Sequence, residues 1–296
     1  MSEIIVKQVM YSHADKELLF QNISFRVPNG GKVALIGNNG SGKSTLLRII
    51  AGDLQPASGK IIVSEKPYHI PQHMGQFDSW TVAEALQVER KIEALHAILG
   101  GSVDVEFFTI LGDDWDIEER IRSALEYWGL PDVRLDQKLS FLSGGEKTKV
   151  FLAGIQVHSP GVILLDEPTN HLDRGSREKL YDLICRGSAT VLVVSHDRVL
   201  LNLLSTMLEL ERKRSVLYGG NYDFYKEQKE IQLDALREQV EEKQKELRLA
   251  KKMAKEVAER QQKREVRGEK QSLKKGVPRI TMNSLKNKAE KSTSHL

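Results

Sequence analysis

The chain has 296 residues, 40% of them hydrophobic, which excludes a wholly disordered protein, and its single cysteine excludes an intrachain disulfide. No apolar run approaches the roughly 20 residues that span a bilayer, and residues 1–10 lack the pattern of a secretory signal, so we expect a soluble, cytoplasmic protein without membrane insertion. The net charge of +3 conceals a basic tail on an acidic body, which indicates a polyanionic partner: residues 226–296 hold 20 Lys and Arg against 12 Asp and Glu, and the rest of the chain holds 24 against 29.

The first part of the chain predicts alternating strands and helices. In chain order, we expect strands over 4–11, 22–27, 32–36 and 60–63 and a helix over 45–51. Helical spacing over 80–99 and 117–128 predicts a helical subdomain at about 79–145. Continuous apolar runs at 162–165 and 191–194 are typical of strands buried on both faces, with a crossover helix over 176–184 between them. Cys185 follows among apolar residues, and we expect it to be an inert core thiol.

A phosphate-binding pattern, G-x-x-x-x-G-K-[ST], follows the predicted strand 32–36 and opens a helix. It comprises Gly37, Asn38, Asn39, Gly40, Ser41, Gly42, Lys43, Ser44 and Thr45. Glycines let backbone N–H groups curl around phosphate oxygens, and a helix N-terminus adds positive potential. We expect Lys43 to reach the β- and γ-phosphates of ATP, Ser44 to ligate Mg²⁺ and Thr45 to support the α-phosphate. The alternative is a glycine-rich turn with a chance lysine.

The apolar run 162–165 ends in two acids, Asp166 and Glu167. Acids at the carboxyl end of a parallel strand face the phosphate site. We expect Asp166 to hold Mg²⁺ through water, and Glu167 to polarise the attacking water as general base. Without the phosphate loop these would be interpreted as surface acids; together with it they predict ATP hydrolysis.

Leu142, Ser143, Gly144, Gly145 and Glu146 resemble the signature of ATP-binding cassette (ABC) proteins, and they precede the strand of Asp166 as in that family. The resemblance implies that Ser143 and the Gly144 and Gly145 amides bind the γ-phosphate held by the opposite cassette, at the start of a helix beginning near Glu146.

Three further positions carry the resemblance, which covers roughly residues 2–220. Gln72 resembles the Q-loop glutamine that senses Mg²⁺ and the attacking water, His196 the switch histidine that contacts the γ-phosphate, and Asp173 the D-loop aspartate at the dimer seam. Members also stack an aromatic ring on adenine, a place that Tyr11 or His13 could take; Tyr11 could equally be a core residue of its strand.

From about residue 225 the composition becomes that of a charged helical linker. An a/d heptad stripe runs through Leu236, Val240, Leu247, Ala250, Ala254 and Val257. We expect a long helix that breaks around Gly268, a second break at 276–278 and a polar segment 280–296. A single heptad helix is unstable alone, so it should fold back as a hairpin or pack on a partner.

Residues 167–173 (EPTNHLD), 195–198 (SHDR) and 219–225 (GGNYDFY) resemble the ABC-F branch of the family. Its members are soluble proteins of two cassettes joined by a charged linker, and they act on the ribosome, some as regulators of translation and some in antibiotic protection. The basic residues of the linker would favour contact with the phosphates of rRNA or tRNA. The alternative is that they form a solvated helix face. These residues are Lys251, Lys252, Lys255, Arg260, Lys263, Arg264, Arg267 and Lys270.

The sequence departs from that branch by carrying one phosphate loop and one signature. One cassette cannot complete its own site, so the chain is a fragment of a two-cassette protein or pairs in trans. The function expected is ATP binding and hydrolysis on the ribosome. The rival interpretations are the ATPase subunit of a transporter and a nucleotide-gated module without turnover.

Overall fold

A computed structural model describes residues 2–13 and 17–274 and consists of two units, one from the N-terminus to Glu227 and one from Gln228 onward. The strands are β1 (Ile4–Ser12), β2 (Leu18–Val27), β3 (Lys32–Ile36), β4 (Ser58–Val63), β5 (Tyr68–Ile70), β6 (Val162–Asp166), β7 (Thr190–Val194), β8 (Thr206–Leu210) and β9 (Ser215–Gly219). The helices are α1 (Lys43–Ala51), α2 (Val82–Ala85), α3 (Glu89–Leu99), α4 (Val105–Leu111), α5 (Ile117–Tyr127), α6 (Gly144–His158), α7 (Arg174–Arg186), α8 (Arg198–Leu203) and α9 (Tyr222–Lys274), with short 3₁₀ turns η1 (Gly75–Phe77) and η2 (Leu139–Phe141).

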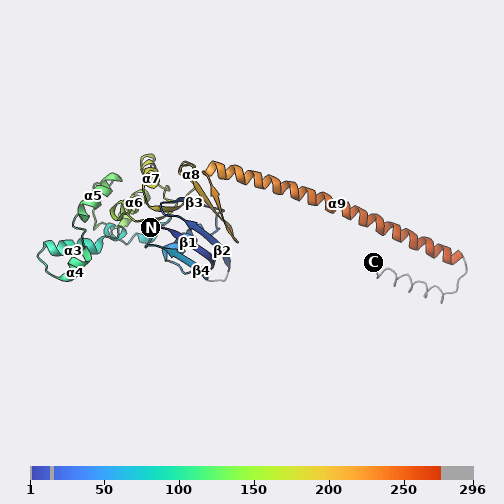
Figure 1. Cartoon of the computed structure of the whole chain (residues 1–296), viewed down its shortest axis with the longest axis horizontal. Coiled ribbons are helices and arrows are strands. Elements are labelled where there is room, and N and C mark those ends of the chain that lie inside the picture. Colours follow the sequence, from blue (N-terminus) through green and yellow to red (C-terminus); the bar gives the residue numbers. More distant parts are fainter. Residues whose placement is uncertain (1, 14–16, 275–296) are drawn as a thin grey trace. The chain divides into compact units, whose positions relative to one another are not determined.

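Two sheets form the framework of the first unit. A six-stranded sheet has the order β5-β6-β7-β3-β8-β9, parallel except for the antiparallel β8–β9 pair, and a three-stranded antiparallel sheet has the order β2-β1-β4. Figure 1 shows α3, α4 and α5 at the end of this unit away from β1, β2 and β4. The predicted α/β fold with a helical subdomain is confirmed.

The central strands are buried on both faces, and their alternating side chains enter two cores. Along β6, Ile163 and Leu165 pack with the helices on one side, whereas Val162 and Leu164 pack with α1 and the three-stranded sheet on the other. Each fully buried side chain of this size contributes about 1.5–3 kcal/mol relative to exposure. The sheet therefore fixes the carboxyl ends of β3 and β6 on one edge, where the phosphate loop and the two acids follow.

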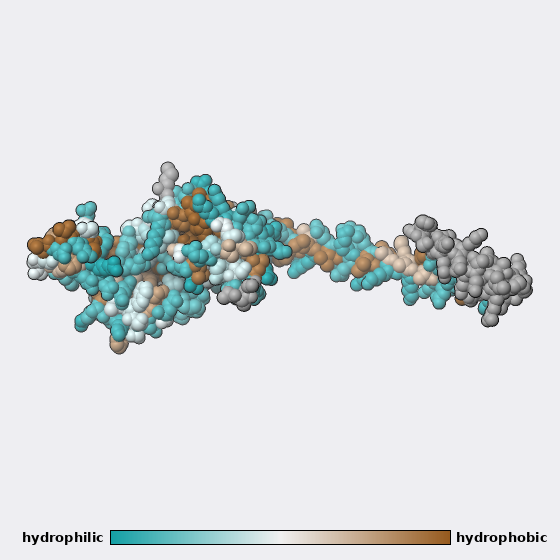
Figure 2. Space-filling view, turned by 90° about the horizontal axis from the view of Figure 1, so that it is seen from below, coloured by the Kyte–Doolittle hydropathy of each residue, from teal (hydrophilic) through white to brown (hydrophobic). Residues whose placement is uncertain are grey.

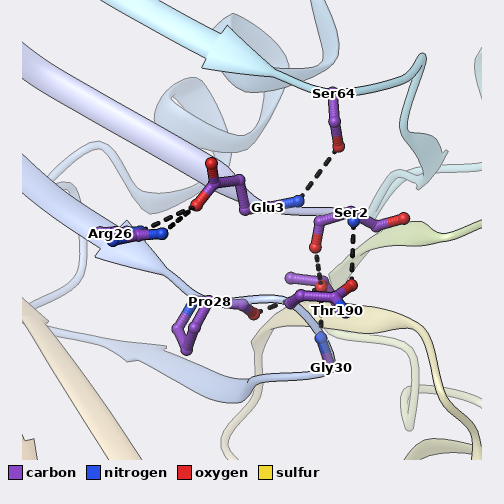
Figure 3. Close-up of polar contacts among 8 residues, drawn as sticks. Ser2, Glu3, Arg26, Pro28, Gly30, Ser64 and Thr190 are labelled. Carbon is purple, nitrogen blue, oxygen red and sulfur yellow. Dashed lines mark hydrogen bonds and ion pairs between the residues drawn. The ribbon is translucent and has the colours of Figure 1, made fainter.

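A buried threonine ties the two sheets together where their strands begin. The Thr190 hydroxyl at the start of β7 donates to the Ser2 carbonyl and accepts from the Gly30 N–H at 2.9 Å (Figure 3). The Glu3 N–H donates to Ser64 Oγ at 3.1 Å beside it. The strand before the phosphate loop is thereby held at its far end.

Three predictions of local structure were wrong. The helical run 80–99 divides into α2 and α3, because Gln87 adopts a left-handed backbone (φ 57°) that ends the first helix. Cys185 is exposed, since α7 turns its Leu180 and Ile184 face inward and the next residue points away. The linker helix continues through Gly268, where one glycine costs about 1 kcal/mol and strong helix formers flank it.

Helix α9 leaves its apolar stripe exposed, including Leu236, Val240 and Leu247. The second break at 276–278, the polar segment 280–296 and any returning arm of a hairpin fall outside the described residues. In the part of the chain that the structure describes, no helix combines the length and apolar character needed to cross a membrane.

Candidate functional site

The phosphate loop connects β3 to α1 through backbone conformations that favour glycine. Gly37, Gly40 and Gly42 have φ of 148°, 77° and 95°. A Cβ on Gly37 would lie 2.7 Å from the Leu210 carbonyl oxygen of β8, a backbone atom that cannot rotate away. The loop therefore needs glycine at Gly37 both for its conformation and for its close approach to β8.

Lys43 folds back over the loop that it follows. Its Nζ donates to the carbonyl oxygens of Gly37 at 2.9 Å and Asn38 at 3.1 Å. Burial lowers the pKa of Lys43, and the nearby Glu167 and Asp166 carboxylates oppose that shift. A buried ammonium at the start of a helix, beside a curled backbone, is a position suited to phosphate.

Asp166 ends β6 within reach of the phosphate loop. The Ser44 hydroxyl donates to its carboxylate, and burial raises the pKa of Asp166 while this hydrogen bond opposes the rise. The carboxylate is 4% exposed, and its Oδ1 has no hydrogen-bond partner among the described residues. A buried oxygen with unused lone pairs requires a partner, and a cation would provide one.

The oxygen donors Ser44 and Asp166 fit a magnesium ion. Mg²⁺ is usually held by one or two carboxylates together with substrate phosphates rather than by a cage of protein ligands. Consistent with this, the described residues contain no group of three or more His, Cys, Asp or Glu that could hold a metal alone. The hydroxyl of Ser41, also buried and without a hydrogen-bond partner in the described chain, lies in the same loop.

Glu167 is held in a strained conformation directly after Asp166. Its φ of 51° is left-handed, and its N–H donates to the Val194 carbonyl of β7 at 2.8 Å. Its Oε2 accepts from the His196 N–H at 3.2 Å, and His196 Nε2 lies 3.4 Å from its Oε1. Burial raises the pKa of Glu167, and His196 opposes the rise. Such strain in a non-glycine residue is typical of functional sites.

A pocket of about 450 Å³ gathers most of the predicted nucleotide residues. Its lining comprises His13, Leu19, Asn39, Gly40, Gly42, Lys43, Ser44, Thr45, Gln72, Asp166, Glu167, Val194 and His196. The ring of Tyr11 lies edge-on to His13 at 5.7 Å and packs near Phe20 at 6.1 Å. His13 is thus the pocket-facing residue of the two candidates for adenine stacking, and the assignment itself stays a prediction.

The signature begins α6, two residues earlier than expected. Ser143 caps the helix: its hydroxyl accepts from the Glu146 N–H at 3.3 Å, while Glu146 Oε2 accepts from the Ser143 N–H at 2.8 Å. The hydrogen bond that the Ser143 N–H donates to the carboxylate, together with a smaller contribution from the Ser143 hydroxyl, lowers the pKa of Glu146. Ser143 and Gly144 are exposed, so this helix start lies at the surface of the domain.

The predicted D-loop residue Asp173 lies between β6 and α7 in the chain and contacts the signature helix α6. Asp173 caps α7 by accepting from the Ser176 N–H at 2.9 Å, and it accepts from Lys149 Nζ of α6 at 2.7 Å. The hydrogen bond from Lys149 is the largest influence that holds the pKa of Asp173 well below its usual range. Sequence reasoning missed Lys149, although its position three residues after Glu146 places it in the first turns of the same helix.

Comparisons with known proteins agree with this geometry. The family model described as "ABC transporter" matches residues 20–170. Among curated relatives, ABC transporter F family member 2 of Arabidopsis thaliana is 33% identical (76% of this chain, 31% of the relative), and the tylosin resistance ATP-binding protein TlrC of Streptomyces fradiae is 30% identical (79% and 47%). The energy-dependent translational throttle protein EttA of Mycobacterium tuberculosis is 32% identical (77% and 44%).

Solved structures share the fold at lower identity. An ATP-binding subunit of an ABC transporter superposes with a TM-score of 0.60 at 22% identity, covering 76% of this chain and 92% of that one. The dimeric cassette MJ0796, in a post-hydrolysis state with ADP and phosphate, gives 0.55 at 23% identity (73% and 98%). The chain spans between about a third and a half of the length of the curated relatives it matches first. With its phosphate loop, strand-end acids and signature in one domain, the chain belongs to the ABC transporter family and carries that family's ATP-binding domain.

Proposed function

We propose that the domain binds ATP with Mg²⁺ and hydrolyses it, as one of a pair of cassettes. The observation that carries the proposal is the buried, strained Glu167, held by Val194 and His196 at the edge of a pocket that Lys43 also lines. A carboxylate whose pKa is raised by burial is a better base than an ordinary surface glutamate. Surface acids after a strand would have neither this burial nor these partners.

The chain's own residues divide the work of the reaction. Lys43 and the loop amides bind the β- and γ-phosphates, Ser44 and Asp166 hold Mg²⁺ with Gln72 nearby, and Glu167 accepts a proton from the attacking water at its carboxylate. The ion, when bound, neutralises charge that develops on the phosphate oxygens. His196, whose side chain is 69% exposed, is free to turn toward the γ-phosphate.

A second cassette completes the site in this proposal. Ser143 and the amides that follow it open a helix at an exposed surface, where they can receive phosphate from a facing domain. Lys149 fixes Asp173 at the neighbouring D-loop, so the two predicted seam elements are held together. The second cassette is either the remainder of a longer protein or another copy of this chain.

The finer proposal places the protein in the ABC-F branch, acting on the ribosome. The F family member, the translational throttle protein and the tylosin resistance protein among its relatives support this assignment. The linker adds a physical reason. Residues 247–274 of α9 hold ten Lys and Arg against four Asp and Glu, whereas residues 226–246 hold five against seven. The C-terminal half of α9 is therefore the basic one, and it favours RNA phosphates.

The test uses Glu167→Gln, which keeps the shape of the side chain and removes the base. ATP binding should survive, turnover should fall by about 10²–10⁴-fold, and the ATP-bound protein should pellet with ribosomes more at low salt than at high salt. Lys43→Ala is the matched control, since it should pellet equally with and without ATP. Unchanged turnover in Glu167→Gln would reject Glu167 as the base.

The ribosomal part of the proposal can fail separately. If Glu167→Gln binds ATP but does not pellet, even after a second cassette is supplied, the ribosome is the wrong target. Partition of the ATP-bound protein with membranes would then favour a transporter subunit. A rate per molecule that rises with protein concentration would indicate pairing in trans.

A further inference from the structure

The helical subdomain ends in a cluster of exposed apolar side chains on α3, α4 and the loops beside them. We call it the α4 patch, and it comprises Leu99, Val103, Val105, Phe108 and Trp115. Val103, Val105 and Leu99 are 87%, 75% and 71% exposed. Figure 2 shows hydrophobic surface at this end of the first unit, where Figure 1 places α3 and α4.

The patch is a second apolar face of a helix that already has a buried one. Helix α4 packs into the core through Leu111, with Phe107 and Ile110 half-buried against it. Val105 and Phe108, one turn apart, point away from that face. The Phe108 ring lies 6.3 Å from the ring of Trp115, so the two aromatics form a continuous surface. Large apolar groups gathered in one exposed place mark interaction sites.

The segment that carries most of the patch is rich in carboxylates, and these limit which partner the patch can accept. Residues 100–119 contain no Lys, Arg or His and seven acids: Asp104, Glu106, Asp113, Asp114, Asp116, Glu118 and Glu119. Asp114 pairs with Lys91 and Arg120, Asp116 with Arg120, and Glu118 with His96. Glu106, Asp113 and Glu119 form no ion pair in the described part of the chain, which leaves net negative charge around the apolar centre.

This charge excludes two classes of partner and favours a third. Nucleic-acid backbones and anionic lipid surfaces would be repelled by the carboxylates of this segment. A segment that places Lys or Arg around large apolar side chains matches both the centre and the rim, as in grooves that receive amphipathic helices. We propose that the α4 patch is a docking surface for a cationic amphipathic helix of a protein partner.

The patch differs in sign from the basic half of α9, so the molecule has two surfaces for partners of opposite charge. Nothing in this assignment depends on ATP hydrolysis or on the ribosome, because it is carried by the exposure and charge of residues 99–119 alone.

The experiment measures binding of a defined probe to the whole 296-residue chain by fluorescence anisotropy. The probe is a labelled Lys/Leu amphipathic helical peptide of about 18 residues, five turns of helix. A Glu/Leu peptide of the same length and a single-stranded oligouridine of about 20 nucleotides serve as the alternative partners. Binding of the Lys/Leu peptide should weaken as salt is raised, because part of its attraction is electrostatic.

Two double variants separate the apolar centre from the acidic rim. Val105→Ser with Phe108→Ser removes the centre, and Glu106→Gln with Asp113→Asn removes rim charge; the altered side chains are exposed, so the fold should persist. Each should weaken Lys/Leu peptide binding by about tenfold or more. Val199→Ser with Leu203→Ser, which removes exposed apolar groups from α8, is the matched control and should leave binding unchanged.

The outcomes decide the proposal without reference to any other activity. Binding of the Lys/Leu peptide that both patch variants weaken, together with no binding of the Glu/Leu peptide, supports it. Equal binding by parent and patch variants would locate the probe elsewhere, for instance on the apolar stripe of α9, and overturn it. Binding of oligouridine that is lost in the patch variants would replace the protein partner by RNA, and no binding of any probe would also overturn it.

Discussion

A methyl group added to Gly145 tests how closely the signature helix packs on the D-loop. An ideal Cβ at Gly145 would lie 2.6 Å from the His171 carbonyl oxygen, whereas one at Gly144 would lie 3.6 Å from the nearest carbon of the His171 side chain. The first is a collision with backbone and the second an ordinary contact. Gly145→Ala must therefore push two backbone segments apart, while Gly144→Ala needs no movement.

The magnitude follows from that difference. Overpacking of this kind costs about 1–3 kcal/mol, and a domain of this size loses about 2–4 °C in melting temperature per kcal/mol. Gly145→Ala should melt roughly 2–12 °C below the parent protein, and Gly144→Ala at or slightly above it, because alanine favours helix.

The assay is thermal unfolding followed by circular dichroism without nucleotide, so that ligand binding does not contribute to the measured stability. Stability is the appropriate readout, since both glycines also lie at the predicted phosphate contact and their turnover is hard to interpret. If the two variants melt at the same temperature, the packing argument for the D-loop is wrong.

Three other predictions concern the phosphate loop, the D-loop and the start of α9. Lys43→Ala should weaken ATP binding by about 10²-fold in titration calorimetry, because the charge held over the Gly37 and Asn38 carbonyls is lost; a change below threefold would contradict its role. Asp173→Asn should lower the free energy of unfolding, measured in urea, by up to about 1 kcal/mol at pH values above the ordinary aspartate pKa of about 3.9. Because Lys149 depresses the pKa of Asp173 in the folded protein, this contribution is lost as the pH falls toward that folded pKa. A stability difference between parent and variant that grows on acidification would refute the assignment. Tyr225→Phe should lower stability by about 1–2 kcal/mol and increase amide exchange at the start of α9, because the Glu209 carboxylate loses a hydroxyl donor at 3.0 Å; unchanged exchange would show that this bond does not hold the helix.

The elements predicted best are those whose patterns are local. The strand 32–36 was confirmed to the residue, and the phosphate loop could be located because its glycines are fixed by backbone geometry within nine residues. The apolar run before Asp166 likewise proved to be a strand buried on both faces, since nothing polar interrupts it. In both places, the residues next to one another in the sequence were sufficient to predict the local structure.

Other elements depend on contacts between residues that are distant in the sequence, and they could not be predicted from the local sequence pattern. Strand β8 includes Glu209, a charge that argues against a buried strand until Tyr218 and Tyr225 are seen donating to it at 3.2 and 3.0 Å. Strand β5 has three residues and is defined by pairing with β6. The link from Lys149 to Asp173 spans 24 positions and joins two helices, so no local pattern predicts it.

Strand β8 also shows how the nucleotide pocket and the start of the linker are connected inside one unit. Ile36, the last residue before the phosphate loop, pairs with Glu209, and Gly37 approaches the carbonyl of Leu210. From the same strand, Glu209 accepts the hydroxyl of Tyr225, which lies in the first turn of α9 and within the first unit. A shift of the loop that moves Gly37 must displace β8 or break its packing, because a backbone carbonyl fills the space beside it. One strand, β8, thus separates the start of α9 from the phosphate loop. Because the Tyr225 hydroxyl contacts the side chain of Glu209 and not the backbone of β8, its loss should affect the helix while leaving the pocket residues in place.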